Sequence, residues 1–285
     1  MTIETKFDNA VKLESQGKLE EAIQIYHDII LLAPDWLAPY FNLGLIQKHR
    51  GQWKESYDNN KKATELAPHD DGSWWNLGIA ATALRRWEMA KQAWNHFGLH
   101  LPITDREPRL NMPMTPIRLN PEDKAEVVWG RRIDPARATL ENVPLPDSNF
   151  RYKDLVLNDG APVGYRISEG KSHPVLNVLQ LIERSSFKTY SLTAFAKDRA
   201  DIETLHQLCQ KEGIGFDDWS NIKFICKQCS EGVPHEHHEL PLNREGITER
   251  IFGFAAITEE SLVRVLNAWL KATGCKCEEL YLELE

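Results

Sequence analysis

The sequence predicts an α+β protein of several domains, with a first third of paired helices, a small β-rich middle segment and a C-terminal domain of strands and helices. Three observations support this fold class. Prolines recur at one fixed spacing in the first third, short alternating apolar and polar runs fill the middle, and strand and helix patterns alternate over residues 185–285. The 285 residues suffice for roughly two or three hydrophobic cores.

The composition is that of ordinary globular domains, with 42% hydrophobic and 27% charged residues. Lys and Arg number 34 and Asp and Glu 42, so the formal net charge of −8 argues against a general nucleic-acid binder. No stretch approaches the ~18 uncharged apolar residues of a membrane span. Residues 1–10 carry charges and lack the apolar core of a secretory signal, so we expect a cytoplasmic protein.

A repeat of 34 residues fills residues 3–104. Three prolines set its period, each shortly after an apolar-periodic stretch, and they are Pro34, Pro68 and Pro102. The corresponding windows are 3–36, 37–70 and 71–104. A fixed period of this length indicates one structural unit that is repeated and stacked.

Small and large side chains fall into register with these prolines. In the second and third windows the first helix carries Leu43-Gly44 and Leu77-Gly78, one turn after Tyr40 and Trp74. The second helices carry Ala22 and Tyr26, then Ser56 and Asn60, then Ala90 and Trp94. Small residues at such positions let paired helices approach closely, and the aromatic residues fill the space beside them.

This pattern resembles the tetratricopeptide repeat family, whose 34-residue unit is a helical hairpin with Trp, Leu-Gly, Tyr, Ala, Phe and Pro at fixed offsets. The resemblance covers residues 3–104 and implies three stacked hairpins. It departs from the family pattern at Ser56 and Asn60, and in the first window. Gly17 and Gly51 occupy the turn within the hairpin, where a residue that tolerates a positive φ is needed, while the third window has Arg85 there.

The resemblance implies a concave surface lined by the first helix of each hairpin. The fifth, sixth and ninth positions of the repeat face it, which are Phe7, Phe41 and Trp75, then Asp8, Asn42 and Asn76, then Val11, Leu45 and Ile79. The polar row can bond an extended peptide backbone and the two apolar rows can hold side chains, so we expect a protein or peptide partner. Alternatively, these residues pack against neighbouring repeats or the protein's own linker.

Binding of chaperone C-terminal tails is not expected on this surface. Repeats that capture a C-terminal carboxylate do so with Lys and Arg there, and apart from Asn42 those positions are not matched in this sequence.

A proline-rich linker is expected over residues 105–124. Five prolines between 102 and 121 forbid a continuous helix and favour extended backbone. The linker either lies in the groove, using Met112, Met114 and Ile117, or forms a strap along the last helix, and we favour the strap.

Residues 125–184 alternate apolar and polar positions in short runs, which predicts a small antiparallel sheet or barrel. Asn158-Asp159-Gly160 is expected to form one of its turns. An arginine cluster lies close to Trp129, and its members are Arg131, Arg132 and Arg137. These arginines either contact phosphate or pair with the acidic neighbours Asp134, Glu141 and Asp147, and we favour pairing.

Residues 185–285 follow the order strand, helix, strand, strand, helix, strand. The strands are expected at 189–196, 221–226, 250–256 and 279–284, and the helices at 201–212 and 259–273. Thr258 is a good N-cap and Gly274 a good stop for the second helix. This order is that of the ferredoxin-like sandwich, which by itself implies no function.

A metal site is expected in this C-terminal domain. Thiolates two residues apart and imidazoles six to nine residues later can complete a tetrahedral zinc site, and the topology brings a second cysteine pair to the same end of the sheet. The candidate ligands are Cys226, Cys229, His235, His237, His238, Cys275 and Cys277. The ligand set remains open: it could be all four cysteines, three cysteines with one histidine, or two cysteines with two histidines. It also remains open whether these residues bind a metal at all.

The function predicted from these features is that of an adaptor or scaffold that binds a partner polypeptide, with a structural zinc ion in the C-terminal domain. The thiolate-rich ligand set would close the zinc site, and no H-E-x-x-H motif, Gly-rich phosphate loop or nucleophile elbow occurs, so we do not expect an enzyme. The alternative is a metal-dependent enzyme or a sensor of metal or small molecules centred on the Cys/His loop.

Overall fold

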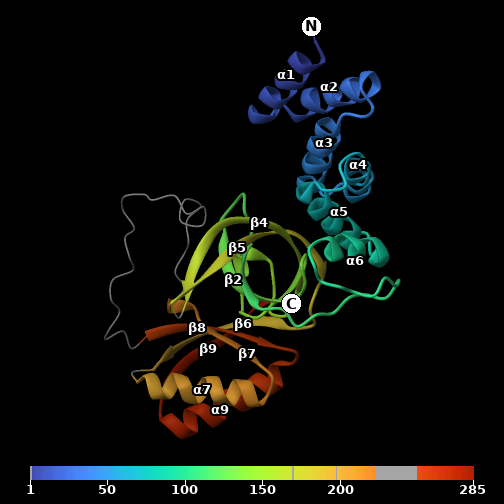
Figure 1. Ribbon diagram of the computed structural model, residues 1–285. Coiled ribbons are helices and arrows are strands. Elements are labelled where there is room, and N and C mark those ends of the chain that lie inside the picture. The colour runs from blue at the N-terminus through green and yellow to red at the C-terminus, as the bar shows by residue number, and fades with distance from the viewer. Residues whose placement is uncertain (1, 169, 197, 222–248) are drawn as a thin grey trace. The chain divides into compact units, whose positions relative to one another are not determined.

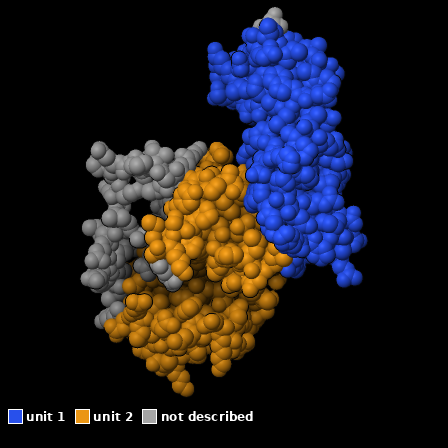
Figure 2. All heavy atoms as spheres, in the orientation of Figure 1, with its two compact units in different colours: residues 1–109 blue, residues 110–285 orange. Residues whose placement is uncertain are grey.

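The computed structural model describes residues 2–168, 170–196, 198–221 and 249–285. The chain divides into two compact units, residues 1–109 and 110–285 (Figure 2). Among the described residues, none of the helices combines the length and the apolar character that a bilayer crossing requires.

The first unit consists of three helical hairpins, one in each expected window (Figure 1). Their helices are α1 (Ile3–Ser15), α2 (Leu19–Leu32), α3 (Leu37–His49), α4 (Trp53–Leu66), α5 (Asp71–Ala83) and α6 (Trp87–His96). The side chain of Thr2 caps α1 by accepting from the Thr5 amide, and that of Asp70 caps α5 by accepting from the Ser73 amide. The turns within the hairpins hold Gly17, Gly51 and Arg85 at φ of 75°, 68° and 56°.

Small residues allow the paired helices to cross closely, as predicted. A Cβ atom on Gly78 would lie 2.5 Å from the Trp94 ring, so only glycine fits between α5 and α6. In the second hairpin the same position, Gly44, faces Asn60, where a Cβ atom would lie 2.4 Å from the amide nitrogen. Ser56 Oγ donates to the Gly44 carbonyl at 2.8 Å, so the departure at Ser56 and Asn60 replaces an aromatic contact with buried hydrogen bonds.

An aromatic side chain also fixes each junction between consecutive hairpins. The Tyr40 hydroxyl donates to the Pro34 carbonyl at 3.1 Å, and Trp74 Nε1 donates to the Pro68 carbonyl at 2.9 Å. These two bonds are 34 residues apart and link the same repeat positions. The same contact therefore recurs with the period of the sequence.

The segment after α6 packs along that helix. Asn95 bonds the backbone of Leu101 through both side-chain atoms, and Lys91 Nζ donates to the carbonyl and hydroxyl of Thr104. These contacts belong to the end of the third repeat window and do not test the strap expected of residues 105–124.

The second unit begins with a closed five-stranded barrel (Figure 1). Its strands are β1 (Met114–Leu119), β2 (Glu126–Asp134), β3 (Arg137–Leu140), β4 (Leu155–Ser168) and β5 (Lys171–Glu183), with a short helix η1 (Pro146–Ser148) before β4. Neighbouring strands are antiparallel, and β1 closes the barrel by lying parallel to β5. Ile117, Leu119, Val128, Leu140 and Leu176 are among the side chains that fill the interior.

Two sequence-based expectations for this region were wrong. The expected linker at 105–124 contains strand β1, because Pro113 and Pro116 are compatible with extended backbone and the apolar residues after them enter the barrel. The expected turn at Asn158-Asp159-Gly160 is absent, since β4 continues through it with register shifts against β5 that absorb these residues.

The remainder of the unit is a four-stranded antiparallel sheet in the order β7-β8-β6-β9. Its strands are β6 (Lys188–Phe195), β7 (Gly215–Asp218), β8 (Glu249–Ala256) and β9 (Lys276–Leu284), and its helices are α7 (Arg199–Lys211) and α9 (Glu259–Thr273). A one-turn helix, η2 (Trp219–Asn221), follows β7. The expected order of strands and helices is therefore present. The strand expected at 221–226 lies, apart from Asn221, outside the described residues, and the described partner of β8 on this side is the earlier segment β7.

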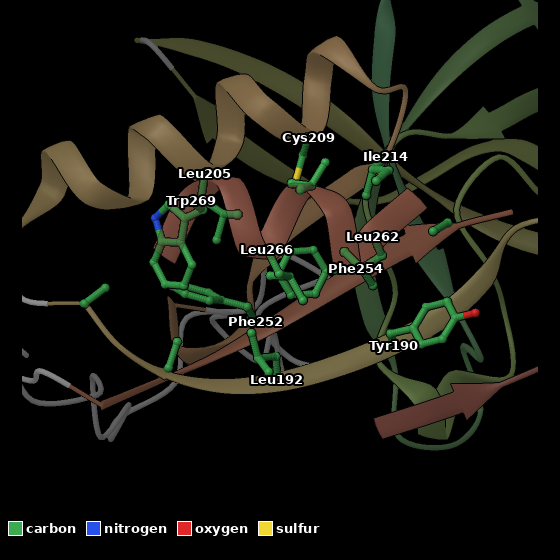
Figure 3. Close-up of a cluster of buried hydrophobic side chains, with 14 residues drawn as sticks. Tyr190, Leu192, Leu205, Cys209, Ile214, Phe252, Phe254, Leu262, Leu266 and Trp269 are labelled. Carbon is green, nitrogen blue, oxygen red and sulfur yellow. The ribbon is translucent and has the colours of Figure 1, made fainter. Parts of the chain in front are cut away.

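The core of this part lies between one face of the sheet and the two helices. Figure 3 shows Leu205 and Cys209 from α7 and Leu266 and Trp269 from α9 gathered over Phe252 and Phe254 of β8. Trp269 Nε1 donates to the Asp201 carbonyl at 2.8 Å, which ties α9 to α7. Thr258 caps α9 and Gly274 ends it at a φ of 70°, as the sequence predicted.

Side chains of strand β7 and helix η2 join the sheet to the barrel segment 142–145. Asp217 accepts from the Val143 amide at 2.6 Å and from Asn142 Nδ2 at 2.9 Å. Trp219 Nε1 donates to the Val143 carbonyl at 2.9 Å. From the barrel side, the Glu126 carboxylate accepts from the Leu145 amide, so two carboxylates hold the same short segment.

Candidate peptide-binding surface

The first aromatic row of the predicted groove packs within the repeats. The Phe7 ring lies 4.8 Å from the Trp36 ring and 5.7 Å from the Tyr26 ring, centroid to centroid. Phe7 is only partly exposed, and it therefore bridges the first hairpin to the start of the second.

The other two members of this row have similar surroundings. The Trp75 ring lies 5.3 Å from Trp94 and 4.9 Å from Phe97 in edge-to-face contacts. The Phe41 ring lies against α5, where a Cβ atom on Gly72 would come within 3.0 Å of it. All three aromatic side chains are half-buried, so they support the helices and offer only their edges to a partner.

The polar row is partly used by internal hydrogen bonds. Asn42 Nδ2 donates to the Tyr26 hydroxyl at 2.9 Å, which in turn donates to Glu14 at 3.0 Å. Lys48 Nζ donates to Asn76 Oδ1 at 3.1 Å, and both side chains are buried. Asp8, in contrast, is exposed on α1.

The exposure of the side chains in the third row decreases from α1 to α5. Val11 on α1 is 42% exposed, Leu45 on α3 is half-buried, and Ile79 on α5 is fully buried. The accessible part of the predicted groove therefore comes mainly from α1 and α3.

Sequence reasoning missed two buried residues that hold the polar row in place, Tyr26 and Lys48. Lys48 lies three residues after Leu45 and seven after Phe41, so helical spacing could have placed it on the same face. Tyr26 comes from a second helix, and no first-helix rule would have found it. Burial raises the pKa of Tyr26 well above its ordinary value, so its hydroxyl stays protonated as the donor to Glu14.

Two of the three arginines of the barrel cluster pair with acidic neighbours, as the sequence favoured. Arg137 bonds Asp134 at 2.6 Å in a fully buried pair, and Arg131 bonds Glu141 at 3.1 Å on the surface. Arg132 donates to the Pro135 carbonyl at 2.7 Å.

Two of the seven candidate metal ligands, Cys275 and Cys277, belong to the described chain. Ala194 of β6 lies opposite Cys277 of β9 and opposite Arg250 of β8, so the starts of β8 and β9 flank the end of β6 as the topology predicted. Cys277 packs against the core, and Cys275 Sγ donates to Asp201 at 3.5 Å. Burial raises the pKa of both thiols, and they do not converge on one point with other described ligand types.

The remaining candidates lie outside the described residues. They are Cys226, Cys229, His235, His237 and His238. Within the described ranges, three or more His, Cys, Asp or Glu side chains never gather in a way that could hold a metal ion.

The contacts of the first unit follow the pattern that the sequence predicted. Hairpins of 34 residues, glycine at the helix crossings and the repeated aromatic bond to a proline carbonyl all occur together. Residues 3–104 thus form three helical hairpins that resemble tetratricopeptide repeats.

Comparison with known proteins gave structural neighbours only. No family model and no curated protein matches the chain. The first tetratricopeptide repeat domain of Spaghetti (RPAP3), bound to an HSP90 peptide, is similar with 20% identity and a TM-score of 0.31, over 33% of this chain and 75% of that one. The Sgt2 domain from Aspergillus fumigatus is similar with 19% identity and a TM-score of 0.31, over 33% and 62% of the two chains.

A further neighbour covers a larger share of this chain. It is a hypothetical protein from Neisseria gonorrhoeae, with 13% identity and a TM-score of 0.27, and the match covers 60% of this chain and 96% of that chain.

Proposed function

We propose that this chain is a protein-interaction adaptor whose tetratricopeptide repeats bind an extended peptide of a partner along α1 and α3. The observation that carries the proposal is the accessible strip formed by Val11, Leu45 and the edge of Phe41, with Asn42 beside it. Binding, and not bond chemistry, is the proposed activity.

The chemistry of this strip suits an extended backbone. Asn42 uses its Nδ2 for Tyr26, and no donor among the described residues pairs with its Oδ1, which leaves an acceptor for a peptide N–H. Val11 and Leu45 belong to one apolar row beside the polar row of Asn42 and offer apolar contact to side chains that alternate along the peptide.

The partner we propose differs from the HSP90 peptide bound by the RPAP3 domain. That peptide, SRMEEVD, is acidic. In the described part of this surface, Lys48 is buried and already bonded to Asn76, whereas Asp8 is exposed. A neutral or basic peptide with alternating apolar residues fits these charges better.

The proposal is tested by comparing two apolar-to-acidic variants of the full-length chain. Val11→Asp with Leu45→Asp places charge on the strip, whereas Leu31→Asp changes a residue of α2 that is 82% exposed and lies on a second helix. We expect quantitative pull-down to recover a partner with the wild-type chain and with Leu31→Asp, but not with the double variant. Equal recovery by all three chains would refute the proposal.

We also infer that residues 188–284 are a ferredoxin-like sandwich. The strand order β7-β8-β6-β9 with all neighbours antiparallel supports it, as do the two helices on one face.

A structural zinc ion in this domain stays a prediction. Elemental analysis of the purified chain would be expected to find about one zinc per molecule, on the stoichiometry of one tetrahedral site. A folded, metal-free chain would refute it. Because the described thiols Cys275 and Cys277 already pack internally, any site would depend on residues outside the described ranges.

A further inference from the structure

The outer face of the barrel carries a row of cationic and aromatic side chains that is separate from the tetratricopeptide surface. Arg131 on β2 lies opposite Met114 on β1, and Arg166 on β4 lies opposite His173 on β5. The parallel pairing of Ile117 with Leu176 sets β1 level with β5, which brings Met114 level with His173. Four neighbouring strands thus align these side chains.

Trp129 lies between the two ends of this row. Its ring centroid is 5.1 Å from that of His173, with the rings nearly perpendicular at 85°. The Arg166 guanidinium carbon lies 5.3 Å from the Trp129 ring centroid, within the range of a cation–π contact. Arg166 is therefore held in place by an aromatic face, while its N–H groups have no acceptor among the described residues.

Of the two arginines in this row, only Arg131 has an acidic partner among the described residues. Arg131 is paired with Glu141 at 3.1 Å and its Nη2 also contacts Met114 Sδ at 3.8 Å. Arg166, in contrast, makes no ion pair and no hydrogen bond with any described residue, and it is half-buried.

A half-buried guanidinium without a counter-charge is costly, because burial removes water that no acceptor replaces. Burial lowers the pKa of Arg166, and no carboxylate among the described residues opposes that effect. In the buried pair of the same barrel, Asp134 lies 2.6 Å from Arg137 and supplies this compensation. None of the described residues supplies such an anion to Arg166, so the site offers an unpaired guanidinium to an added anion.

We propose that Arg166, stacked on Trp129 beside His173, binds the phosphate or carboxylate group of a small ligand. The planar fork of a guanidinium matches two oxygens of either group. A long polyanion is disfavoured, since Glu141 neutralises the neighbouring Arg131 and the chain carries a net charge of −8. Trp129 acts as a positioning residue that fixes the plane of the guanidinium.

The site is tested with three probes added to the full-length chain at constant ionic strength: inorganic phosphate, phenyl phosphate and benzoate. Nuclear magnetic resonance of the tryptophan indole N–H groups provides the signal, and the Trp129 resonance is assigned by its loss in Trp129→Phe. We expect saturable shifts of the Trp129 resonance. A preference for phenyl phosphate over benzoate would assign a phosphate ligand, and the opposite preference a carboxylate.

Variants separate a specific site from general charge effects. Arg166→Gln should weaken binding of the preferred probe at least about tenfold, as expected for loss of a charge-assisted hydrogen bond. Arg166→Lys keeps the positive charge but lacks the planar fork of a guanidinium. Its affinity for the preferred probe should therefore lie between that of the wild-type chain and that of Arg166→Gln. Arg264→Gln removes an exposed arginine of α9 and should leave binding unchanged.

Two results would overturn the proposal. One is the absence of saturable binding by all three probes at concentrations of tens of millimolar, on the scale of weak anion sites. The other is an equal effect of Arg166→Gln and Arg264→Gln, which would mean that only net charge matters. Arg166 would then serve only to cover Trp129.

Discussion

Replacing Glu126 by Gln is expected to make the protein more stable at neutral pH and to leave its stability almost unchanged in mild acid. Glu126 is 7% exposed, and both of its carboxylate oxygens face one donor, the Leu145 amide, at 3.0 and 3.2 Å. A single N–H cannot replace the water that a carboxylate loses on burial. A glutamine keeps an oxygen for the same amide and carries no charge.

The size of the effect follows from the pKa of Glu126. Burial raises it from 4.5 to about 7, with a further contribution from the negative charge of Asp217. Because the folded state holds this proton to a higher pH than the unfolded chain, the group contributes full stability below about pH 4.5. That contribution is lost as the pH rises to about 7. At 1.36 kcal/mol per pKa unit, the loss is about 3 kcal/mol.

Urea unfolding of the wild-type and Glu126→Gln chains between pH 4.5 and 8 measures this directly. The difference in unfolding free energy should grow by about 3 kcal/mol toward neutral pH in favour of the variant. Glu122→Gln serves as the control, since Glu122 is exposed in the β1–β2 turn. A difference that stays constant with pH would show that Glu126 ionises normally and would refute the reasoning.

Asp217 is the less suitable position for this experiment. Burial raises its pKa from 3.8 to about 6, but both of its oxygens accept hydrogen bonds, from Val143 and Asn142. Asp217→Asn would turn an NH₂ group toward one of these donors, so a lost hydrogen bond would mask the gain from removing the charge.

Three further outcomes are expected. Gly78→Ala should lower the unfolding free energy by about 2 kcal/mol, because the new Cβ would meet the Trp94 ring at 2.5 Å; unchanged urea unfolding would contradict that contact. Arg85→Gly should raise stability by about 1 kcal/mol, since Arg85 has a φ of 56°, whereas Arg85→Ala should not; equal midpoints for the two variants would argue against strain there. Cys209 should resist iodoacetamide at pH 8 in the folded chain and react in urea, because burial raises the pKa of its thiol to about 12. Peptide mapping by mass spectrometry measures the alkylation of Cys209. Alkylation under native conditions would show that α7 opens.

The repeats were predictable from sequence because their contacts are local and recur with the same period. Gly78 and Trp94 lie within one hairpin, and Tyr40 reaches back only to Pro34. A window of 34 residues therefore contains nearly every interaction that defines the fold. The complete burial of Ile79 was not predictable, since the repeat pattern gives the helix face on which it lies but not which residues cover that face.

The barrel and its junction with the sheet depend on contacts that local patterns do not contain. Asp217 bonds Val143 across 74 residues, which allows an acidic residue to sit in a half-buried strand. Asn158 reads as a turn residue, yet it is buried in β4 with its amide bonded to the carbonyls of Pro135 and Asp159. Tertiary hydrogen bonds at such positions override the local preference.

The candidate surface was predicted in outline and not in detail. The repeat positions of Val11 and Leu45 were enough to expect an accessible apolar row. The hydrogen bond from Asn42 Nδ2 to the Tyr26 hydroxyl could not be predicted, because it depends on the distance between two helices. Arg166 gave no sequence signal, since the lack of a carboxylate beside it in the described part of the chain is a property of three-dimensional space.

The odd strand count of the barrel sets how the polypeptide passes through it. A meander of five strands leaves the first and last running in the same direction, so the backbone enters at one rim and departs from the opposite one. A shortened protein lacking the barrel would therefore need a bridging segment between these two rims, whereas an even-stranded barrel could be excised and closed with a tight turn.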